Sequence, residues 1–221
     1  MREVVVDTET TGLDPVQGHR IIEIGCIELV NHVPTGEKFQ SYLNPGMAVP
    51  SDAVAVHGLS AERLGGMPSF ADVVEGFLDF LSDSPLVIHN AEFDLGFLNA
   101  ELARLGRAAI PSSRAIDTVT MARRRFPGAP ASLDALCKRF AIDLSERALH
   151  GALLDARLLA AVYLELIGGR QAGLDLAAPS RADHGKGGRA PRAPRAHAPS
   201  VAELAAHEAF LDKLGDPLWR G

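Results

Sequence analysis

The sequence predicts an α/β fold, in which helices pack on the faces of a mixed β-sheet. Short runs of apolar residues, at 4–6 and 86–88, have the length and composition of buried strands. Longer segments with apolar residues at helical spacing alternate with such runs in the second half of the domain. The chain has 221 residues, of which 47% are hydrophobic, so it can bury one substantial core. One main α/β domain with an appendage is therefore expected.

The N-terminal part of the sheet is predicted to be an antiparallel meander. The strand that contains residues 4–6 is followed by two further strands, at residues 20–30 and 37–43. Residues 31–36 contain Asn, Pro, Thr and Gly, which favour a turn between these two strands. The three strands together open the predicted sheet.

Helices alternate with short strands from residue 69 onward. Helical patterns cover residues 69–81, 91–105, 132–140 and 152–167. Asn90 is the expected N-cap of the second of these helices. Asp117 follows a short strand at 115–116 and is expected to cap a further helix. The pattern stops at Gly168-Gly169, so we place the end of the domain at residue 169.

The composition changes after this domain. Residues 179–199 are rich in Ala, Pro, Arg and Gly and contain almost no large apolar residue, which predicts a flexible linker. Residues 201–214 return to helical spacing, and Trp219 follows near the end of the chain. A helix this short cannot fold alone, so residues 200–221 are expected to form a docking peptide for a partner. The alternative is that they pack back on their own domain.

Composition also limits the cellular setting and the partners. No segment has the features of a signal peptide or a membrane span, so a cytoplasmic protein without a membrane partner is expected. Cys26 and Cys137 lie in apolar patterns and are expected to be small buried residues. The net charge is -6, which disfavours unaided binding to nucleic acid because such binding needs many Lys and Arg residues. A nucleic-acid substrate would need to be presented by another protein.

Two acidic residues at the end of the first strand point to a metal-dependent reaction. Asp7 and Glu9 are two residues apart, so both side chains leave the same face of that strand. Two such carboxylates repel each other unless a cation lies beside them. Carboxylate oxygens suit Mg²⁺ or Mn²⁺, and neither cysteines nor several histidines accompany them, which argues against zinc. The strand end is thus expected to bind a hard divalent cation.

Asp94, Asp155 and His150 complete this set. Asp94 falls in the first turn of its helix, where the helix dipole alone could account for a carboxylate. Asp155 lies in an apolar helix, where it needs either a cation or a solvent-facing stripe. His150 and Asp155 would lie on different sides of one straight helix, which places His150 in the loop before Gly151. A loop histidine can accept a proton from an attacking water, because histidine titrates close to neutral pH.

Five segments follow one another in a specific order along the domain. They are Asp7-Thr-Glu-Thr-Thr-Gly-Leu13, Val56-His57-Gly58-Leu59, His89-Asn-Ala-Glu-Phe-Asp94, Ser132-Leu-Asp-Ala-Leu-Cys137 and Leu149-His-Gly-Ala-Leu-Leu-Asp155. In this order they resemble the DEDDh 3′–5′ exonuclease family, and most closely its proofreading branch, the epsilon subunits of bacterial DNA polymerase III. The resemblance implies a ribonuclease-H-like fold. It also implies removal of nucleotides one at a time from a DNA 3′ end, with release of nucleoside 5′-monophosphates.

The resemblance implies roles for single residues as well. Asp7 would bridge two divalent cations, Mg²⁺ or Mn²⁺, while Glu9 and Asp155 complete the shell of the first and Asp94 supports the second. His150 would be the general base. The residues implied to bind the terminal nucleotide are Asp7, Glu9, Thr10, Gly12, Leu13, Asp52, His57 and Asp155. The family often has Glu where this chain has Asp52, and both Asp52 and His57 could instead be plain helix-end residues.

The resemblance extends past the first domain. Residues 170–178 are similar to a clamp-binding peptide, whose implied contacts are Gln171, Leu174 and Leu176. A helix C-terminal tail is the alternative for this segment. Residues 200–221 resemble a polymerase-binding tail, whose implied contacts are Phe210, Leu211, Leu214, Leu218 and Trp219.

Three functions are compatible with the sequence. The first is a proofreading DNA exonuclease tethered by its tail to a replicative polymerase. The second is a free RNA-trimming 3′–5′ exonuclease of the same fold. The third is a catalytically silent module that braces polymerase and clamp, which the intact acidic set disfavours.

Overall fold

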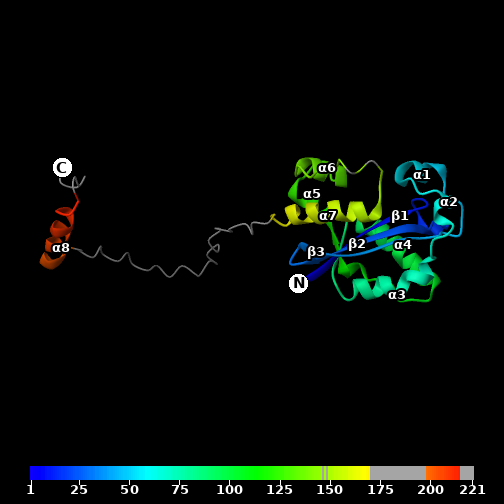
Figure 1. The fold of residues 1–221 in the computed structure, drawn as a ribbon, viewed down its shortest axis with the longest axis horizontal. Helices are drawn as coiled ribbons and strands as arrows, with labels where there is room; N and C mark the ends of the chain where they lie inside the picture. The colour runs from blue at the N-terminus through cyan, green and yellow to red at the C-terminus, as the bar shows by residue number, and fades with distance from the viewer. Residues whose placement is uncertain (146, 148, 170–197, 215–221) are drawn as a thin grey trace, which may run out of the picture. The chain divides into compact units, whose positions relative to one another are not determined.

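A five-stranded mixed sheet organises the first part of the chain (Figure 1). The computed structural model describes residues 1–145, 147, 149–169 and 198–214. The chain divides into two units, Met1–Leu174 and Asp175–Gly221. The strand order in the first unit is β3-β2-β1-β4-β5.

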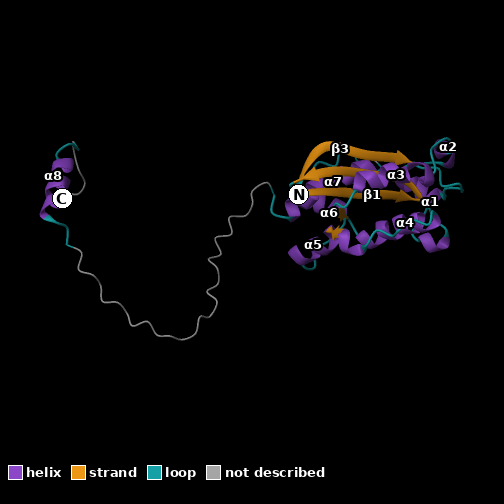
Figure 2. Cartoon of the chain, turned by 90° about the horizontal axis from the view of Figure 1, so that it is seen from below, coloured by secondary structure: helices purple, strands orange, loops and turns teal. Residues whose placement is uncertain are grey.

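Helices cover both faces of this sheet (Figures 1 and 2). One face carries α3 (Phe70–Leu81) and α4 (Ala91–Arg104). The helices on the other face are α5 (Thr118–Arg125), α6 (Leu133–Arg139) and α7 (Ala152–Leu166). The predicted mixed sheet with flanking helices is confirmed.

The antiparallel half of the sheet contains β1 (Arg2–Thr10), β2 (Ile21–Val30) and β3 (Val33–Tyr42). Each pairs antiparallel with the next, so the predicted meander is confirmed. The predicted turn at residues 31–36 is wrong, because β3 begins at Val33. Asn31 and His32 alone make the connection, with φ of 51° and 67°. A two-residue hairpin of type I′ has positive φ at both positions, which Asn tolerates, and this allows β3 to start early.

The parallel half of the sheet brings three strand ends to one edge. The strands β4 (Leu86–Ile88) and β5 (Ala115–Asp117) run parallel to β1. Parallel strands end at the same edge of a sheet, and ligands commonly bind there. The residues after β4 and β5 therefore meet the end of β1, where the acidic pair lies.

Alternation along β1 assigns its side chains to the two faces. Val4 and Val6 belong to the core cluster that contains the buried side chains of α3 and α4. Val5 belongs to the cluster of α7. Successive side chains on a strand point to opposite faces. Asp7 and Glu9 share the parity of Val5, so they emerge on the side of α7.

Two helices begin at their predicted N-cap residues, Asp117 and Asn90. Asp117 accepts a hydrogen bond from the backbone N–H of Val119 at 2.9 Å and caps α5, as predicted. Asn90 lies at the N-cap position of α4, but its φ is 67° and its side chain makes no capping hydrogen bond. Asn90 is thus the N-cap residue, as predicted, but it caps α4 without a side-chain hydrogen bond, because a left-handed residue at this position turns its side chain away from the first helical N–H groups.

Several short helices have no clear periodic signal. They are η1 (Pro15–Gln17), α1 (Ser51–His57), α2 (Ala61–Leu64) and η2 (Ser112–Arg114). Each is too short for one face to recur along the sequence. Cys26 and Cys137 are both buried and free, as predicted.

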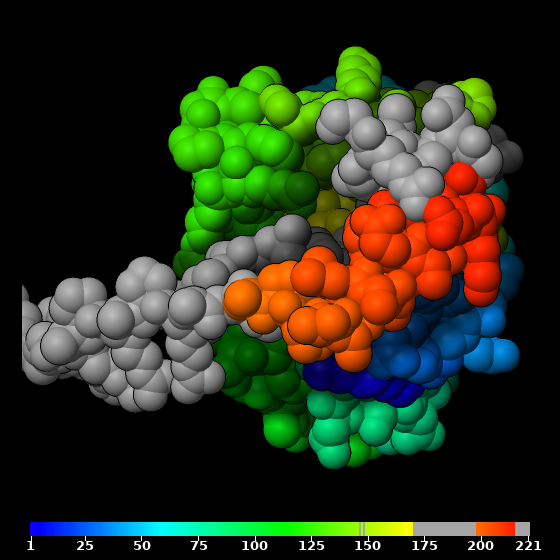
Figure 3. Space-filling view, turned by 90° about the vertical axis from the view of Figure 1, so that its left-hand side faces the viewer, coloured from blue at the N-terminus to red at the C-terminus, as the bar shows by residue number. Residues whose placement is uncertain are grey.

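The second unit contains α8 (Val201–Leu211), which is shown in orange to red in Figure 3. The helix ends three residues before the predicted Leu214, and Ser200 and Glu203 form a capping box at its start. Residues 201–210 are exposed.

The predicted clamp peptide and all but the last two residues of the predicted linker lie outside the described residues. In the part of the chain that the structure describes, none of the helices combines the length and apolarity needed to cross a bilayer.

Candidate active site

Two carboxyls at the end of β1 form the centre of the candidate site. Burial raises the pKa of Asp7 well above its usual range, and the charges of Asp94 and Glu9 raise it further. Burial also raises the pKa of Glu9 to about 8, and the charges of Asp155 and Glu23 add to this effect. Both shifts favour the protonated form, and a bound cation would oppose them.

Asp94 joins this pair from the first turn of α4. Its side chain is buried, and its Oδ1 accepts hydrogen bonds from the backbone N–H of Thr8 at 3.0 Å and from Thr8 Oγ1 at 2.7 Å. Burial raises the pKa of Asp94 to about 7, although the Thr8 hydrogen bonds act in the opposite direction. The helix dipole favours a carboxylate in the first turn even when the side chain is exposed. It therefore does not explain why the Asp94 side chain is buried.

Asp155 comes from the first turn of α7, which lies directly on the backbone of β2. A Cβ atom on Gly25 would lie only 2.3 Å from the carbonyl carbon of Ala152 and the nitrogen of Leu153. Glu23, also on β2, accepts a hydrogen bond from the backbone N–H of Ala152 at 3.1 Å. These contacts fix the start of α7 and hold the buried Asp155 beside the end of β1.

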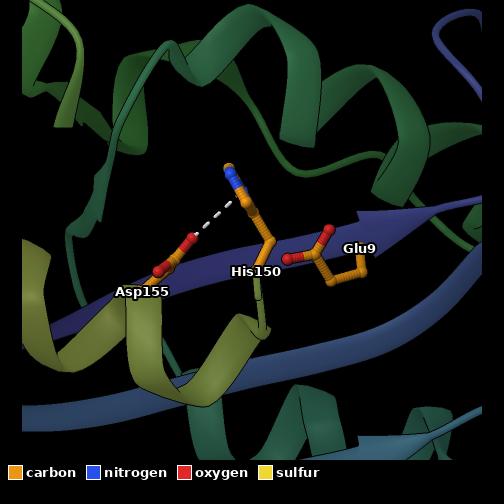
Figure 4. Close-up of side chains that lie close together, drawn as sticks. All are labelled: Glu9, His150 and Asp155. Carbon is orange, nitrogen blue, oxygen red and sulfur yellow. Dashed lines mark ion pairs between the residues drawn. The ribbon is translucent and has the colours of Figure 1, made fainter. Parts of the chain in front are cut away.

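His150 lies in the loop before α7, as its spacing from Asp155 predicted. Its side chain is 48% exposed, and its Nδ1 is 3.5 Å from Asp155 Oδ2 (Figure 4). Ligand atoms of Glu9, His150 and Asp155 all lie within 4.8 Å of one another. The backbone N–H of His150 donates to the carbonyl of Val56 at 3.1 Å, which ties this loop to α1. The structure therefore brings the predicted general base to the carboxyl cluster.

Arg147 is a site residue that the sequence analysis missed. Its Nε and Nη2 donate to the two carboxylate oxygens of Asp155, each at 2.6 Å. Nη1 pairs with Asp134, and Nη2 is 3.2 Å from His150 Nδ1. The hydrogen bonds to Asp155 raise the pKa of the guanidinium. The sequence signal was weak, since Arg147 is a single basic residue just outside the segment that carries His150 and Asp155.

A cleft of about 600 Å³ lies next to the carboxyls. The predicted nucleotide-binding residues that line it are Glu9, Thr10, Gly12, Leu13, Asp52 and His57. Thr10 Oγ1 donates to the carbonyl of Gly12 at 2.6 Å, and a Cβ on Gly12 would lie 2.3 Å from the His19 ring. The Leu13 side chain is 85% exposed although it is large and apolar. Such a side chain beside a cleft is suited to contact an apolar ligand surface.

Asp52 and His57 occupy the two ends of α1 and also line this cleft. Asp52 lies in the exposed first turn. His57 is buried, and its Nδ1 accepts a hydrogen bond from the backbone N–H of Leu59 at 3.0 Å. Its buried Nε2 has no hydrogen-bond partner among the described residues. Burial lowers the pKa of His57, and the charge of His150 lowers it further. Asp52 and His57 therefore lie at the ends of a helix and also line the cleft, so the two expectations for these residues do not exclude each other.

A second cleft, of about 270 Å³, also borders the carboxyls. Its walls are formed by Asp7, His89, Ser132, Leu133, Asp134, Arg147, His150 and Asp155. The rings of Phe93 and Phe97 lie 5.0 Å apart, but the two residues differ in burial. Phe97 is in the core, while Phe93 is partly buried and lines the larger cleft.

The carboxyl cluster fits a divalent cation. Asp7, Glu9 and Asp94 have raised pKa values because they are buried close to one another. A bound cation would favour the ionised form of each and remove the repulsion between them. Carboxylate oxygens are the ligands of Mg²⁺, Mn²⁺ and Ca²⁺ sites, which agrees with a hard cation at this position.

The predicted tail contacts fall partly within the described residues. Phe210, on α8, and Leu214, just after it, are exposed, whereas Leu211 is buried. The remaining predicted clamp and polymerase contacts, Gln171, Leu174, Leu176, Leu218 and Trp219, lie outside the described residues.

Comparison with known proteins identifies the family. The model of the exonuclease family matches residues 4–163. The chain belongs to the exonuclease family. DNA polymerase III subunit epsilon of Salmonella typhimurium is 44% identical, across 99% of this chain and 97% of that protein. The corresponding subunit of Rickettsia felis is 59% identical, across 77% of this chain and 76% of that protein. The predicted family and its proofreading branch are confirmed.

Solved structures of exonucleases have the same fold. Exonuclease X, in complex with 5′ overhanging duplex DNA, is 25% identical with a TM-score of 0.59 and covers 74% of this chain and 90% of that one. The nuclease domain of 3′hExo, a DEDDh family member bound to rAMP, is 18% identical with a TM-score of 0.65. It covers 75% of this chain and 91% of that one. The predicted ribonuclease-H-like fold and the assignment as a metal-dependent 3′–5′ exonuclease are confirmed.

Proposed function

We propose that this protein is the proofreading exonuclease of a bacterial replicative DNA polymerase, DNA polymerase III. It removes the 3′-terminal nucleotide of a primer strand and releases a nucleoside 5′-monophosphate. The observation that carries the proposal is the convergence of four acidic residues and a loop histidine beside the 600 Å³ cleft, the residues being Asp7, Glu9, Asp94, Asp155 and His150. The epsilon subunits that match nearly the whole chain support the link to this polymerase.

The acidic residues would hold two divalent cations, Mg²⁺ or Mn²⁺. Asp7 would contact both ions, Glu9 and Asp155 would complete the ligands of one, and Asp94 would support the other. When bound, such a pair of ions stabilises the attacking and leaving oxygens of a phosphodiester displacement. The Thr8 hydrogen bonds orient Asp94, and the contacts of α7 with β2 orient Asp155. The chain thus supplies ligands whose positions are fixed before the ions bind.

His150 would act as the general base. Its side chain is half exposed and lies on a loop, so it can reach a water molecule at the edge of the carboxyl cluster. A ring nitrogen accepts the proton of this water as the water attacks the terminal phosphodiester. The hydrogen bond between the His150 backbone and Val56 limits how far the loop can move.

The larger cleft would hold the terminal nucleotide. Thr10 and Gly12 bring backbone close to the ligand, and the exposed Leu13 offers an apolar surface to a base. The free Nε2 of His57 supports a polar contact with the sugar or phosphate, because a buried nitrogen without a partner is costly. Asp52 reaches less far than a Glu would, so its contact would be the weakest of these.

The tail would deliver the enzyme to its substrate. The net charge of -6 gives the chain little electrostatic attraction for DNA. Tethering through residues 200–221 would bring the enzyme to the DNA instead. A flexible linker of roughly two dozen residues has a root-mean-square span of about 25–30 Å, which keeps the nuclease near the primer end. The exposed Phe210 and Leu214 would contact the polymerase, and residues 170–178 would contact the sliding clamp.

Nuclease activity is tested with the full chain and 5′-labelled single-stranded DNA. We expect Mg²⁺-dependent release of nucleoside 5′-monophosphates, reduced about a thousandfold or more by Asp7→Asn. Asp79→Asn on the exposed face of α3 is the matched control and should leave the rate unchanged. Digestion of RNA but not of DNA would favour the free RNA-trimming enzyme. No digestion of either by the wild type would favour the silent module.

Tethering is tested by co-purification with the catalytic subunit of the replicative polymerase. Full-length protein should be retained, and a version that ends at residue 199 should be lost while its nuclease rate stays the same. Retention of the truncated version would contradict the role proposed for the tail.

A further inference from the structure

Arg147 is a cation that contacts two of the proposed catalytic residues, Asp155 and His150. Its side chain is only 10% exposed, and its guanidinium contacts three groups of the second cleft. Two of its nitrogens bind the two oxygens of Asp155, one pairs with Asp134, and Nη2 also lies 3.2 Å from His150 Nδ1. Two parallel hydrogen bonds between a guanidinium and a carboxylate form a strong and geometrically specific pair.

These contacts engage the atoms that the proposed reaction uses. Asp155 has both oxygens bound to Arg147, although it is a proposed ligand of a divalent cation. An arginine only donates hydrogen bonds, so in this arrangement Nδ1 of His150 accepts and its lone pair is occupied. A single side chain therefore restrains one proposed metal ligand and the proposed general base.

We propose that Arg147 is a resident cation that holds the site in a resting state, and that a divalent cation must displace it from Asp155 to bind. This inference rests on the metal site of the proposed function. The guanidinium offsets part of the negative charge of the buried carboxyls while no divalent ion is bound. Binding of the ion and release of Arg147 are consequently one coupled equilibrium.

The structure gives Arg147 a place to which it can withdraw. Arg147 is outside the helices and strands, in the connection between α6 and α7. Asp134, on α6, is 50% exposed and already contacts its Nη1. After release from Asp155 the guanidinium can keep this partner and remain at the edge of the second cleft. No buried charge is left unpaired by the exchange, because the incoming cation replaces Arg147 at Asp155.

The experiment is a titration of the metal-free full-length protein with Mn²⁺, followed by calorimetry, together with thermal melting in EDTA. Arg147→Gln should bind Mn²⁺ about tenfold more tightly than the wild type, because the competitor is gone. Its metal-free form should melt at a lower temperature, because Asp155 loses the guanidinium that binds both of its oxygens. Arg147→Lys keeps the positive charge but cannot form the two parallel hydrogen bonds to Asp155. Its affinity for Mn²⁺ should therefore lie between those of the wild type and Arg147→Gln.

Arg157→Gln is the matched control. Arg157 is exposed on α7, two residues from Asp155, so its removal changes the local charge without changing the proposed competition. Its affinity for Mn²⁺ should stay within about twofold of the wild type. The inference is overturned if neither Arg147 variant binds Mn²⁺ more tightly than the wild type, or if Arg157→Gln gives the same gain. Absence of Mn²⁺ binding by the wild type would instead contradict the metal site of the proposed function.

Discussion

The metal-free protein should lose stability as the pH rises from 5 to 8. Glu9 has a usual pKa of 4.5 and a pKa of about 8 in the folded protein. Between these two values the folded state binds a proton that the unfolded state has released, so the free energy of unfolding falls as the pH rises. Asp94, with a pKa of about 7, acts in the same direction. Saturating Mg²⁺ should remove this dependence, because the cation stabilises the ionised carboxyls.

The size of the effect follows from the pKa of Glu9. Each pH unit inside the window changes the free energy of unfolding by about 1.4 kcal/mol, so three units change it by about 4 kcal/mol. For a domain of this size that corresponds to a fall of about 10 °C in the melting temperature. His57 and His89 have lowered pKa values and act with the opposite sign, but only below about pH 6.5. The interval from pH 6.5 to 8 therefore reports on the carboxyls.

Differential scanning calorimetry at constant ionic strength, in EDTA and in Mg²⁺, measures this dependence. Glu9→Gln removes one titrating carboxyl and should flatten the EDTA curve, whereas Asp79→Asn should leave it unchanged. A metal-free melting temperature that stays constant or rises between pH 6.5 and 8 would refute the reasoning.

Substitutions at three residues test the contacts that build the site and the core. Glu23→Ala should lower the free energy of unfolding by about 1–3 kcal/mol in urea and weaken Mn²⁺ binding, since Ala152 loses its acceptor. Glu23→Gln should retain most of the stability and most of the Mn²⁺ affinity, because an amide oxygen can still accept the hydrogen bond from Ala152. Gly25→Ala places a Cβ against the α7 backbone and should lower stability by several kcal/mol, and a wild-type urea midpoint would contradict this. Tyr163→Phe removes the 2.6 Å hydrogen bond to the buried Glu3 and should lower the melting temperature without changing the nuclease rate.

Features set by neighbouring residues were predictable from the sequence. The longer helices and the strands were found because their apolar residues recur at local spacings. The cap at Asp117 depends on a hydrogen bond to a residue two positions away. His150 was placed in a loop by an angular argument that uses only its offset from Asp155. The meeting of Asp7, Asp94 and Asp155 was expected from the resemblance of the ordered segments to the DEDDh exonucleases, since local spacing does not show that these residues come together.

Features set by distant residues were not predictable in this way. Glu23 is 129 positions from the Ala152 N–H that it binds, and in the sequence it is only an acidic residue within an apolar strand. The contacts of Arg147 depend on the path of the segment between α6 and α7, which has no periodic pattern. The early start of β3 depended on the conformation of Asn31 and His32, where one hairpin type replaced a longer turn.

The same burial that orients the carboxyls also makes the fold dependent on cations. Asp94 and Asp155 are each 3% exposed, and fixed positions of this kind require packing on all sides. Packing removes water, which raises the pKa of Asp7, Glu9 and Asp94 and destabilises their ionised forms. A divalent ion that binds only the folded state reverses this destabilisation by mass action. A substitution that removes one of these carboxyls, such as Glu9→Gln, should therefore raise metal-free stability at pH 8 while lowering activity. A variant in which both rise together would show that preorganisation of the carboxyls is not what limits stability.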